Sequence, residues 1–344
     1  MDTATTPRVA VIGAGYWGPN LARNFAASPE WTLVAVCDRD EARASKLAAA
    51  VGHVDVETSV DELLARDDLD AVAIATPAAT HHPLTLAALR AGKHVVVEKP
   101  IADSIEKAQE MVDEAKRRGL VLMTDHTFCY TPVVAKIREL IENGDLGDIL
   151  FVDSVRINLG LVQPDVDVFW DLAPHDLSIL DFVLPGGLKP EYVAAHGGDP
   201  IGAGKACVGH LVLPIGDGAV ASVHVNWLSP TKVRQMTIGG SRRTLIWDDL
   251  NPVQRLSVFD RGVTLESQSA TELDGDAKAA AKVSYRLGDT WSPALPEREA
   301  LREMVNEFAA AIREGRPART DGEAGLRVLR VLEEATATMN GARA

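Results

Sequence analysis

The chain has 344 residues, more than one hydrophobic core usually serves, so we expect two domains. Hydrophobic residues make up 46% and charged residues 24%, which is close to the average for globular proteins and excludes a fibrous or largely disordered chain. The formal net charge of -14 argues against a nucleic acid or an anionic membrane surface as partner, because both need a basic face.

The sequence also lacks the signals of export and of membrane insertion. No apolar run approaches the roughly 20 residues of a transmembrane helix. The polar start, Met1–Pro7, lacks the basic-then-apolar order of a signal peptide. The three cysteines lie far apart, with no disulfide-type or metal-type spacing: Cys37, Cys129 and Cys207. We therefore expect free core thiols and a cytoplasmic protein.

The N-terminal part alternates strand and helix patterns, which predicts a parallel sheet with helices on both faces. The clearest helix is expected over residues 103–118, with Asp103 and Glu106 as a capping box and Gly119 after its end. Five short apolar runs are expected as buried strands: Val9–Ile12, Leu33–Cys37, Ala71–Ala75, His94–Val97 and Leu120–Met123.

After about residue 125 the pattern changes to that of an α+β domain with a large, open, mostly antiparallel sheet. We expect loops from Asp260 to Gly288. Helices are expected at Pro132–Glu142, His175–Phe182, Pro296–Glu314 and Gly322–Met339, and strands at Ile149–Val155, Tyr192–His196, Ala206–Leu213, Ala219–Trp227, Arg234–Ile238 and Thr244–Trp247. The predicted fold class is thus α/β, with a Rossmann domain at 1–125 and a second domain at 126–344, whose last helices could pack back on the first.

A glycine-rich turn follows the first strand. Gly13, Gly15 and Gly18 form the pattern G-x-G-x-x-G, with Tyr16 and Trp17 between the last two. The first glycine permits a tight turn, the second lets the backbone approach a pyrophosphate, and the third lets the helix pack on the strand. The N-terminus of that helix then offers free N–H groups to the phosphates. The turn predicts a dinucleotide site.

The second strand ends at Asp38, 20 residues after Gly18. An acidic residue at this place accepts hydrogen bonds from the adenosine ribose and repels a 2′-phosphate, so NAD is favoured over NADP. The neighbouring Arg39 could soften that preference.

Two further segments carry groups suited to acid–base chemistry. Lys99 follows a buried strand at the edge where open α/β sheets place ligands, and an ammonium there can hold a developing alkoxide. Asp171 and His175 are four residues apart, and Pro174, tolerated in a first helical turn, predicts that both lie at a helix start. Spacing alone favours a cap and a packing residue at these two positions over a catalytic pair.

Together these segments resemble the glucose–fructose oxidoreductase / inositol dehydrogenase (Gfo/Idh/MocA) family over nearly the whole chain. The resemblance rests on four motifs: the turn Gly13–Gly18, Thr76-Pro77 followed by His81, Gly92–Pro100 with its Glu-Lys-Pro, and Asp171-x-x-x-His175. It implies that Lys99 and His175 act on a substrate hydroxyl, with Asp171 beside them. It also implies that Thr76, Pro77, His81 and Glu98 line the cofactor.

Within the family, the segments around Trp17 and Pro174 look most like members of sugar-nucleotide and polysaccharide pathways. The leading hypothesis is an NAD-dependent dehydrogenase acting on a secondary ring hydroxyl of a sugar, with a nucleotide sugar favoured. An inositol or cyclitol dehydrogenase is the first alternative. A non-catalytic NAD-binding regulator is the second, and the presence of both Lys99 and His175 speaks against it.

Other residues have weaker indications. Arg156 and Asn158, on the first strand of the second domain, are candidates for substrate contacts, and Tyr130 is a candidate for lining the cleft. Trp227, Lys232 and Arg234 are better explained as a solvated turn with one packed ring. We expect no metal site, because His82, His94 and His126 lack a metal-type pairing. The free face of the open sheet, as in the family, predicts a homodimer or homotetramer.

Overall fold

The computed structural model describes residues 6–164, 166–266 and 282–341. The chain forms two compact units. The first comprises Met1–Ala135, Trp170–Lys189 and Pro296–Ala344, and the second comprises Lys136–Phe169 and Pro190–Leu295. The units therefore differ from the expected division at residue 125, because segments distant in sequence pack together with the N-terminal part.

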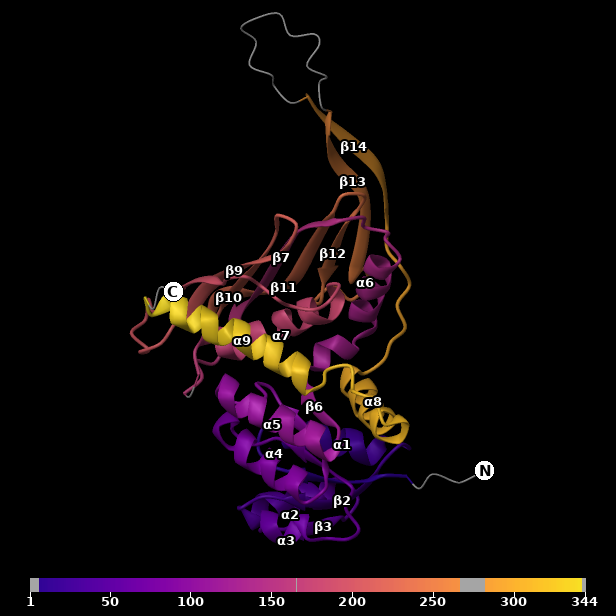
Figure 1. Ribbon diagram of the computed structural model, residues 1–344, viewed down its shortest axis with the longest axis vertical. Helices are drawn as coiled ribbons and strands as arrows, with labels where there is room; N and C mark the ends of the chain where they lie inside the picture. Colours follow the sequence, from indigo (N-terminus) through magenta and orange to yellow (C-terminus); the bar gives the residue numbers. More distant parts are fainter. Residues whose placement is uncertain (1–5, 165, 267–281, 342–344) are drawn as a thin grey trace, which may run out of the picture. The chain divides into compact units, whose positions relative to one another are not determined.

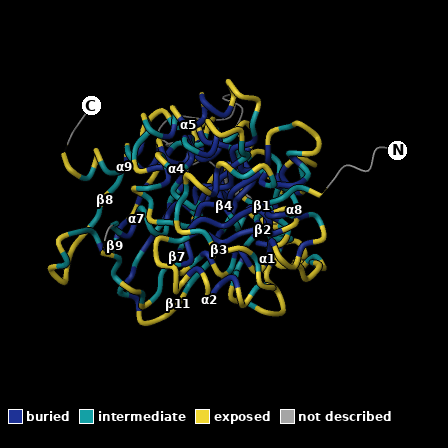
Figure 2. The backbone as a smooth tube through the Cα atoms, turned by 90° about the horizontal axis from the view of Figure 1, so that it is seen from below, coloured by how far each residue is buried: buried dark blue, intermediate teal, exposed yellow. Residues whose placement is uncertain are grey.

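The first unit is built on a parallel sheet, as predicted, but the sheet has six strands where five were expected, the additional one being β3. Its buried strands appear in Figure 2 as dark blue tubes around β1 and β4. Their spatial order is β3 (Asp55–Glu57), β2 (Thr32–Cys37), β1 (Arg8–Ile12), β4 (Ala71–Ile74), β5 (His94–Glu98) and β6 (Leu122–Asp125). Parallel strands end at one common edge, and the order reverses between β1 and β4, where open α/β sheets bind ligands.

Helices α1 (Gly18–Ala27), α2 (Glu41–Ala50), α3 (Val60–Leu64), α4 (His81–Arg90) and α5 (Ile105–Arg118) surround this sheet (Figure 1). Helix α8 (Ala300–Glu314) packs against α1, and α9 (Gly322–Met339) packs against α5 and β6. Helix α7 (Val168–Val183) also lies mostly in this unit. The predicted capping box of α5 is wrong, because the cap is Ser104, whose hydroxyl accepts from the backbone N–H of Lys107. Asp103 instead pairs with the Lys107 ammonium at 2.8 Å. Among the described residues, no helix is long and apolar enough to cross a membrane.

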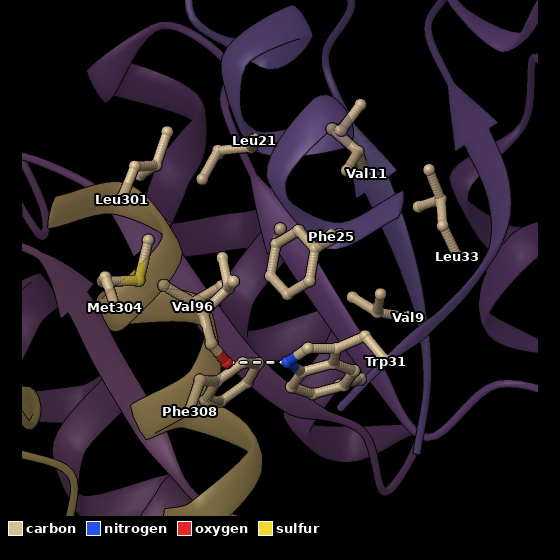
Figure 3. Packing of buried hydrophobic residues seen from close by; sticks show 14 of the residues in the cluster. Val9, Val11, Leu21, Phe25, Trp31, Leu33, Val96, Leu301, Met304 and Phe308 are labelled. Carbon is tan, nitrogen blue, oxygen red and sulfur yellow. Dashed lines mark hydrogen bonds between the residues drawn. The ribbon is translucent and has the colours of Figure 1, made fainter. Parts of the chain in front are cut away.

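An aromatic cluster joins α8 to the N-terminal segments of the first unit (Figure 3). The Trp31 ring lies 5.2 Å from the ring of Phe25, edge-on, and 5.2 Å from that of Phe308, stacked. Its indole N–H donates to the carbonyl oxygen of Val305 at 2.6 Å. These contacts explain why a helix near the C-terminus belongs to the unit that contains the first strands.

The second unit contains an eight-stranded sheet, mostly antiparallel as predicted. Only β7 and β10 pair in parallel among its described strands. The spatial order is β14 (Lys282–Trp291), β13 (Leu256–Glu266), β12 (Thr244–Asp248), β11 (Leu228–Gly240), β7 (Ile149–Leu159), β10 (Ala219–Asn226), β9 (Val208–Gly216) and β8 (Ala194–Gly198). The helix α6 (Pro132–Glu142) begins in the first unit and ends in the second.

The loops expected from Asp260 to Gly288 are contradicted at both ends of that range. Strands β13 and β14 pair over residues 256–266 and 282–291, and the intervening part of the expected loop lies outside the described residues. The described residues of β14 from Tyr285 on are exposed, although Val283, Tyr285 and Leu287 alternate with polar residues in the sequence. This alternation is a strand signal that the expectation of loops did not use, and pairing with β13 completes the strand.

We expect Phe308→Ala to lower the free energy of unfolding by about 3–5 kcal/mol, because it removes a fully buried ring from the aromatic cluster. Arg313→Ala, also on α8, removes a surface ion pair with Glu30 and should cost at most about 1 kcal/mol. Urea unfolding followed by circular dichroism measures both. Equal losses in the two variants would contradict the importance of this packing.

Candidate active site

The turn between β1 and α1 fits a dinucleotide. Gly13 has a φ of 103°, and a Cβ there would lie 2.6 Å from the carbonyl oxygen of Ala75. A Cβ on Gly18 would lie 1.9 Å from the carbonyl oxygen of Gly13, whereas one on Gly15 would meet nothing within 4 Å. Two glycines are thus required by close packing, and the middle one faces open space. This is the arrangement that lets a pyrophosphate approach the backbone.

Asp38 holds this turn from the end of β2. One carboxylate oxygen accepts from the backbone N–H of Ala14 at 2.8 Å, and the other accepts from that of Asp40 at 2.9 Å. The Arg43 guanidinium lies 3.5 Å from the second oxygen, and Arg39 is exposed beside it. Asp38 therefore has a structural role in the glycine turn besides its predicted contact with a ribose.

His81 clamps two loops at the same edge of the sheet. Its Nδ1 lies 2.8 Å from the carbonyl oxygen of Pro100, and its Nε2 lies 2.8 Å from that of Thr76. Burial lowers the pKa of His81, although the two carbonyls act in the opposite direction. The ring is almost completely buried. Its two hydrogen bonds join the Thr76-Pro77 turn to the segment that follows Lys99. A direct contact of His81 with the cofactor remains a prediction.

Lys99 and Asp171 are in direct contact within the first unit. The Lys99 ammonium donates to the backbone carbonyl of Asp171 at 3.0 Å and lies 3.6 Å from its carboxylate. The side chains of Lys99 and Asp171 are 20% and 19% exposed, so the pair is shielded but accessible. His175 lies one turn further along α7, with its ring 5.2 Å from that of Phe128. The structure thus brings the predicted lysine to the helix that carries Asp171 and His175.

Pro174 lies inside α7 rather than in its first turn, so that prediction is wrong. The helix begins at Val168, six residues earlier, and Pro174 provides no backbone N–H for the carbonyl of Trp170. Tertiary contacts with α9 hold the helix in spite of this loss. The indole N–H of Trp170 donates to Thr336 at 2.9 Å, and Arg327 pairs with Asp181 at 2.7 Å.

Glu98, Asp125 and His126 are further polar residues at the carboxyl edge of the parallel sheet. Glu98 on β5 lies directly opposite Asp125 on β6 in the register of the sheet. Burial, reinforced by Asp125 and opposed by Lys99, raises the pKa of Glu98 well above its ordinary value. Both ring nitrogens of His126 are buried without a partner in the described structure, and burial together with Lys99 lowers its pKa to about 3.

The sequence pattern does not single out Asp125 or His126 as site residues. Their position at the carboxyl end of β6 would have indicated a site. The expected strand ended at Met123, however, whereas β6 extends to Asp125. Trp17 from the glycine turn also reaches this point, and its indole N–H donates to Asp125 at 3.1 Å. Tyr16, its neighbour, is 94% exposed.

The remaining candidates lie elsewhere. Arg156 and Asn158 are on β7 of the second unit, where Arg156 is buried and lies opposite Arg234 in the sheet. Trp227 is buried and Lys232 is exposed. Tyr130 is buried in the first unit, with its hydroxyl 2.9 Å from that of Thr320. Within the described ranges, no group of three or more His, Cys, Asp or Glu side chains is arranged to hold a metal ion.

Comparison with protein families agrees with this architecture. Residues 7–126 match the model of the oxidoreductase family with an NAD-binding Rossmann fold, and residues 134–246 match the Gfo/Idh/MocA C-terminal domain. The chain belongs to the Gfo/Idh/MocA family of oxidoreductases.

Individual relatives extend the comparison over most of the chain. UDP-N-acetylglucosamine 3-dehydrogenase of Acidithiobacillus ferrooxidans is 30% identical over 94% of each chain, and its crystal structure matches with a TM-score of 0.79 over 97% of this chain and 98% of that one. Myo-inositol 2-dehydrogenase of Thermotoga maritima is 25% identical over 92% of each. The structure of GenD2 from gentamicin A biosynthesis, in complex with NAD, matches with a TM-score of 0.79 at 25% identity, over 98% of this chain and 95% of that one.

His126 predicts a specific dependence of stability on pH. Its pKa is about 3 in the folded chain and 6.5 ordinarily, so the unfolded chain binds a proton first as the pH falls. As the pH falls from about 6.5 to about 3, His126 should therefore lower the free energy of unfolding by about 1.4 kcal/mol for each pH unit. Urea unfolding of His126→Gln across this range should show a smaller slope than the wild type. A slope unchanged by His126→Gln, or reduced equally by His196→Gln at an exposed ring, would contradict this assignment.

Proposed function

We propose that this protein is an NAD-dependent dehydrogenase that oxidises a secondary ring hydroxyl of a sugar, with a nucleotide sugar as the favoured substrate. The observation that carries the proposal is the contact of Lys99 with Asp171, one helical turn from His175, at the edge of a sheet that also carries the glycine turn and Asp38. In this proposal His175, Lys99 and Asp171 serve as the base, the cation and the orienting carboxylate beside a dinucleotide site.

Each residue has a distinct task in this proposal. The bound nicotinamide supplies the hydride acceptor. His175 takes the proton of the substrate hydroxyl, because an imidazole is suited to proton transfer near neutral pH. The Lys99 ammonium stabilises the negative charge that develops on the substrate oxygen. Asp171 holds the Lys99 ammonium through its backbone carbonyl, and its carboxylate, 3.6 Å from that ammonium, orients the substrate.

The relatives support a sugar or cyclitol as the substrate. The relative named for a nucleotide sugar is 30% identical, and the one named for myo-inositol is 25% identical. We propose residues 126–344 as the substrate-binding and oligomerisation domain, with Arg156 and Asn158 in contact with the substrate. Formation of reduced nicotinamide with a panel of nucleotide sugars, myo-inositol and scyllo-inositol separates the two classes. Tight NAD binding without turnover on any of them, together with capture of a protein partner, would instead favour a regulator.

Catalysis by Lys99 and His175 is tested by Lys99→Met and His175→Asn. We expect each variant to lose about 10²- to 10⁴-fold in turnover while it still binds the dinucleotide, because proton transfer and charge stabilisation are lost but the glycine turn is intact. Lys107→Met, which changes an exposed lysine on α5, is the matched control and should retain turnover. Wild-type turnover in either site variant would refute the role of that residue.

The preference for NAD over NADP is attributed to Asp38. We expect the wild type to bind NAD at least about tenfold more tightly than NADP, and Asp38→Asn to narrow the ratio, because the variant removes the charge that repels a 2′-phosphate. An asparagine oxygen can still accept from Ala14, so the turn is retained. Isothermal titration with both cofactors measures the ratio, and an unchanged ratio would exclude Asp38 as its cause.

We also propose a cytoplasmic homodimer or homotetramer. The three cysteines are buried and free, which suits a reducing compartment. The open sheet of the second unit exposes apolar side chains along β7, β9 and β10, among them Phe151, Val212 and Val220. We therefore expect a dimer or tetramer in light scattering at micromolar concentration, and a monomer under those conditions would refute the assembly.

A further inference from the structure

The carboxyl groups of Glu98 and Asp125 form a pair at the ends of two adjacent strands. The two residues are direct partners in the register of β5 and β6, so their side chains project from the same face of the sheet. Two neighbouring carboxyl groups that are shielded from water do not both ionise, because like charges repel each other, so the pair holds one proton and one negative charge.

The surroundings assign the negative charge to Asp125. One of its oxygens accepts from the indole N–H of Trp17 at 3.1 Å, and the other accepts from the hydroxyl of Thr127 at 2.6 Å. Asp125 is almost completely buried, so both donors stabilise its charge where water cannot. The Oε1 of Glu98 is buried without a partner, and burial raises the pKa of Glu98, as a protonated acid requires. Glu98 is therefore the member of the pair that holds the proton.

The pair lies in the half of the sheet that would receive the nicotinamide. A dinucleotide spans the point where the strand order reverses, here between β1 and β4. Asp38 follows β2, so the adenosine belongs to the half formed by β1, β2 and β3, and the second nucleotide belongs to β4, β5 and β6. Glu98 and Asp125 end β5 and β6. Trp17 connects Asp125 to the glycine turn itself.

We propose that the single negative charge of the Glu98–Asp125 pair makes this site bind the oxidised dinucleotide more tightly than the reduced one. The inference rests on the proposed function, since it requires a nicotinamide over this half of the sheet. The oxidised nicotinamide ring carries a positive charge and the reduced ring is neutral, so a fixed negative charge nearby interacts differently with the two forms. The Lys99 ammonium, which acts on Glu98, is itself paired with the Asp171 carboxylate 3.6 Å away.

Two matched variants separate the proton from the charge. Glu98→Gln replaces the protonated acid by a neutral amide, so the charge remains. The double variant Glu98→Gln/Asp125→Asn removes the charge from an amide pair of the same size. A single Asp125→Asn variant is less decisive, because Glu98 could then ionise in its place. Isothermal titration gives the dissociation constants for NAD⁺ and NADH, or for the NADP forms if the wild type prefers them.

The ratio of the dissociation constants for NAD⁺ and NADH tests the inference. We expect Glu98→Gln to keep the wild-type ratio within about twofold, and the double variant to weaken NAD⁺ relative to NADH by about tenfold, the size expected for one charge acting over roughly 10 Å in a partly buried site. Asp38→Asn, in the half of the sheet that receives the adenosine, should change the affinities for NAD⁺ and NADH by the same factor. An unchanged ratio in the double variant would overturn the inference, whereas a wild type that binds neither form would overturn the proposed function itself.

A spectroscopic measurement keeps the inference testable if the double variant does not fold. Infrared difference spectra of the wild type should show the carbonyl stretch of a protonated carboxylic acid that disappears in Glu98→Gln. The absence of such a band, or its persistence in Glu98→Gln, would show that Glu98 does not hold the proton and would overturn the charge assignment.

Discussion

The positive charge of the Lys99 ammonium influences the ion pairs and the pKa values of its neighbours at the carboxyl edge of the parallel sheet. Its positive charge is met by the carbonyl and the carboxylate of Asp171. The same charge, together with burial, keeps His126 neutral, and it opposes the upward shift in the pKa of Glu98. A lysine held in this way beside α7, the helix that carries His175, is suited to stabilise an oxyanion rather than to support the fold.

The parallel sheet places these groups close together without any sequence proximity. Every strand ends at the same edge, so the glycine turn, Asp38, Lys99 and Asp125 come from four different strand ends. Helix α7 then supplies Asp171 and His175, and its contacts with α9 through Trp170 keep it helical around Pro174. Because α7 and α9 both pack in the first unit, the catalytic candidates Lys99, Asp171 and His175 all belong to one compact body.

The parts of the fold that follow from local pattern could be predicted, and those that depend on tertiary pairing could not. The glycine turn, the strands β1, β2, β4, β5 and β6 and the final helices are visible in the sequence because apolar periodicity and turn residues specify them. The short strand β3 was missed, because its residues are mostly polar and it forms by pairing with β2. The start of α7 at Val168 is obscured by Pro174, and β13 and β14 are obscured by the polar composition of the stretch that contains them. Asp125 escaped prediction for a related reason: its importance comes from a partner on the next strand, Glu98, and from Trp17.

The structure of the protein crystallised with NAD⁺ tests the central claim most directly. The account predicts the pyrophosphate over Gly15, the adenosine ribose on Asp38, and the nicotinamide beside Glu98 with Lys99 within reach of a substrate on its exposed face. A pyrophosphate bound away from the glycine turn, or a nicotinamide remote from Lys99 and His175, would contradict it.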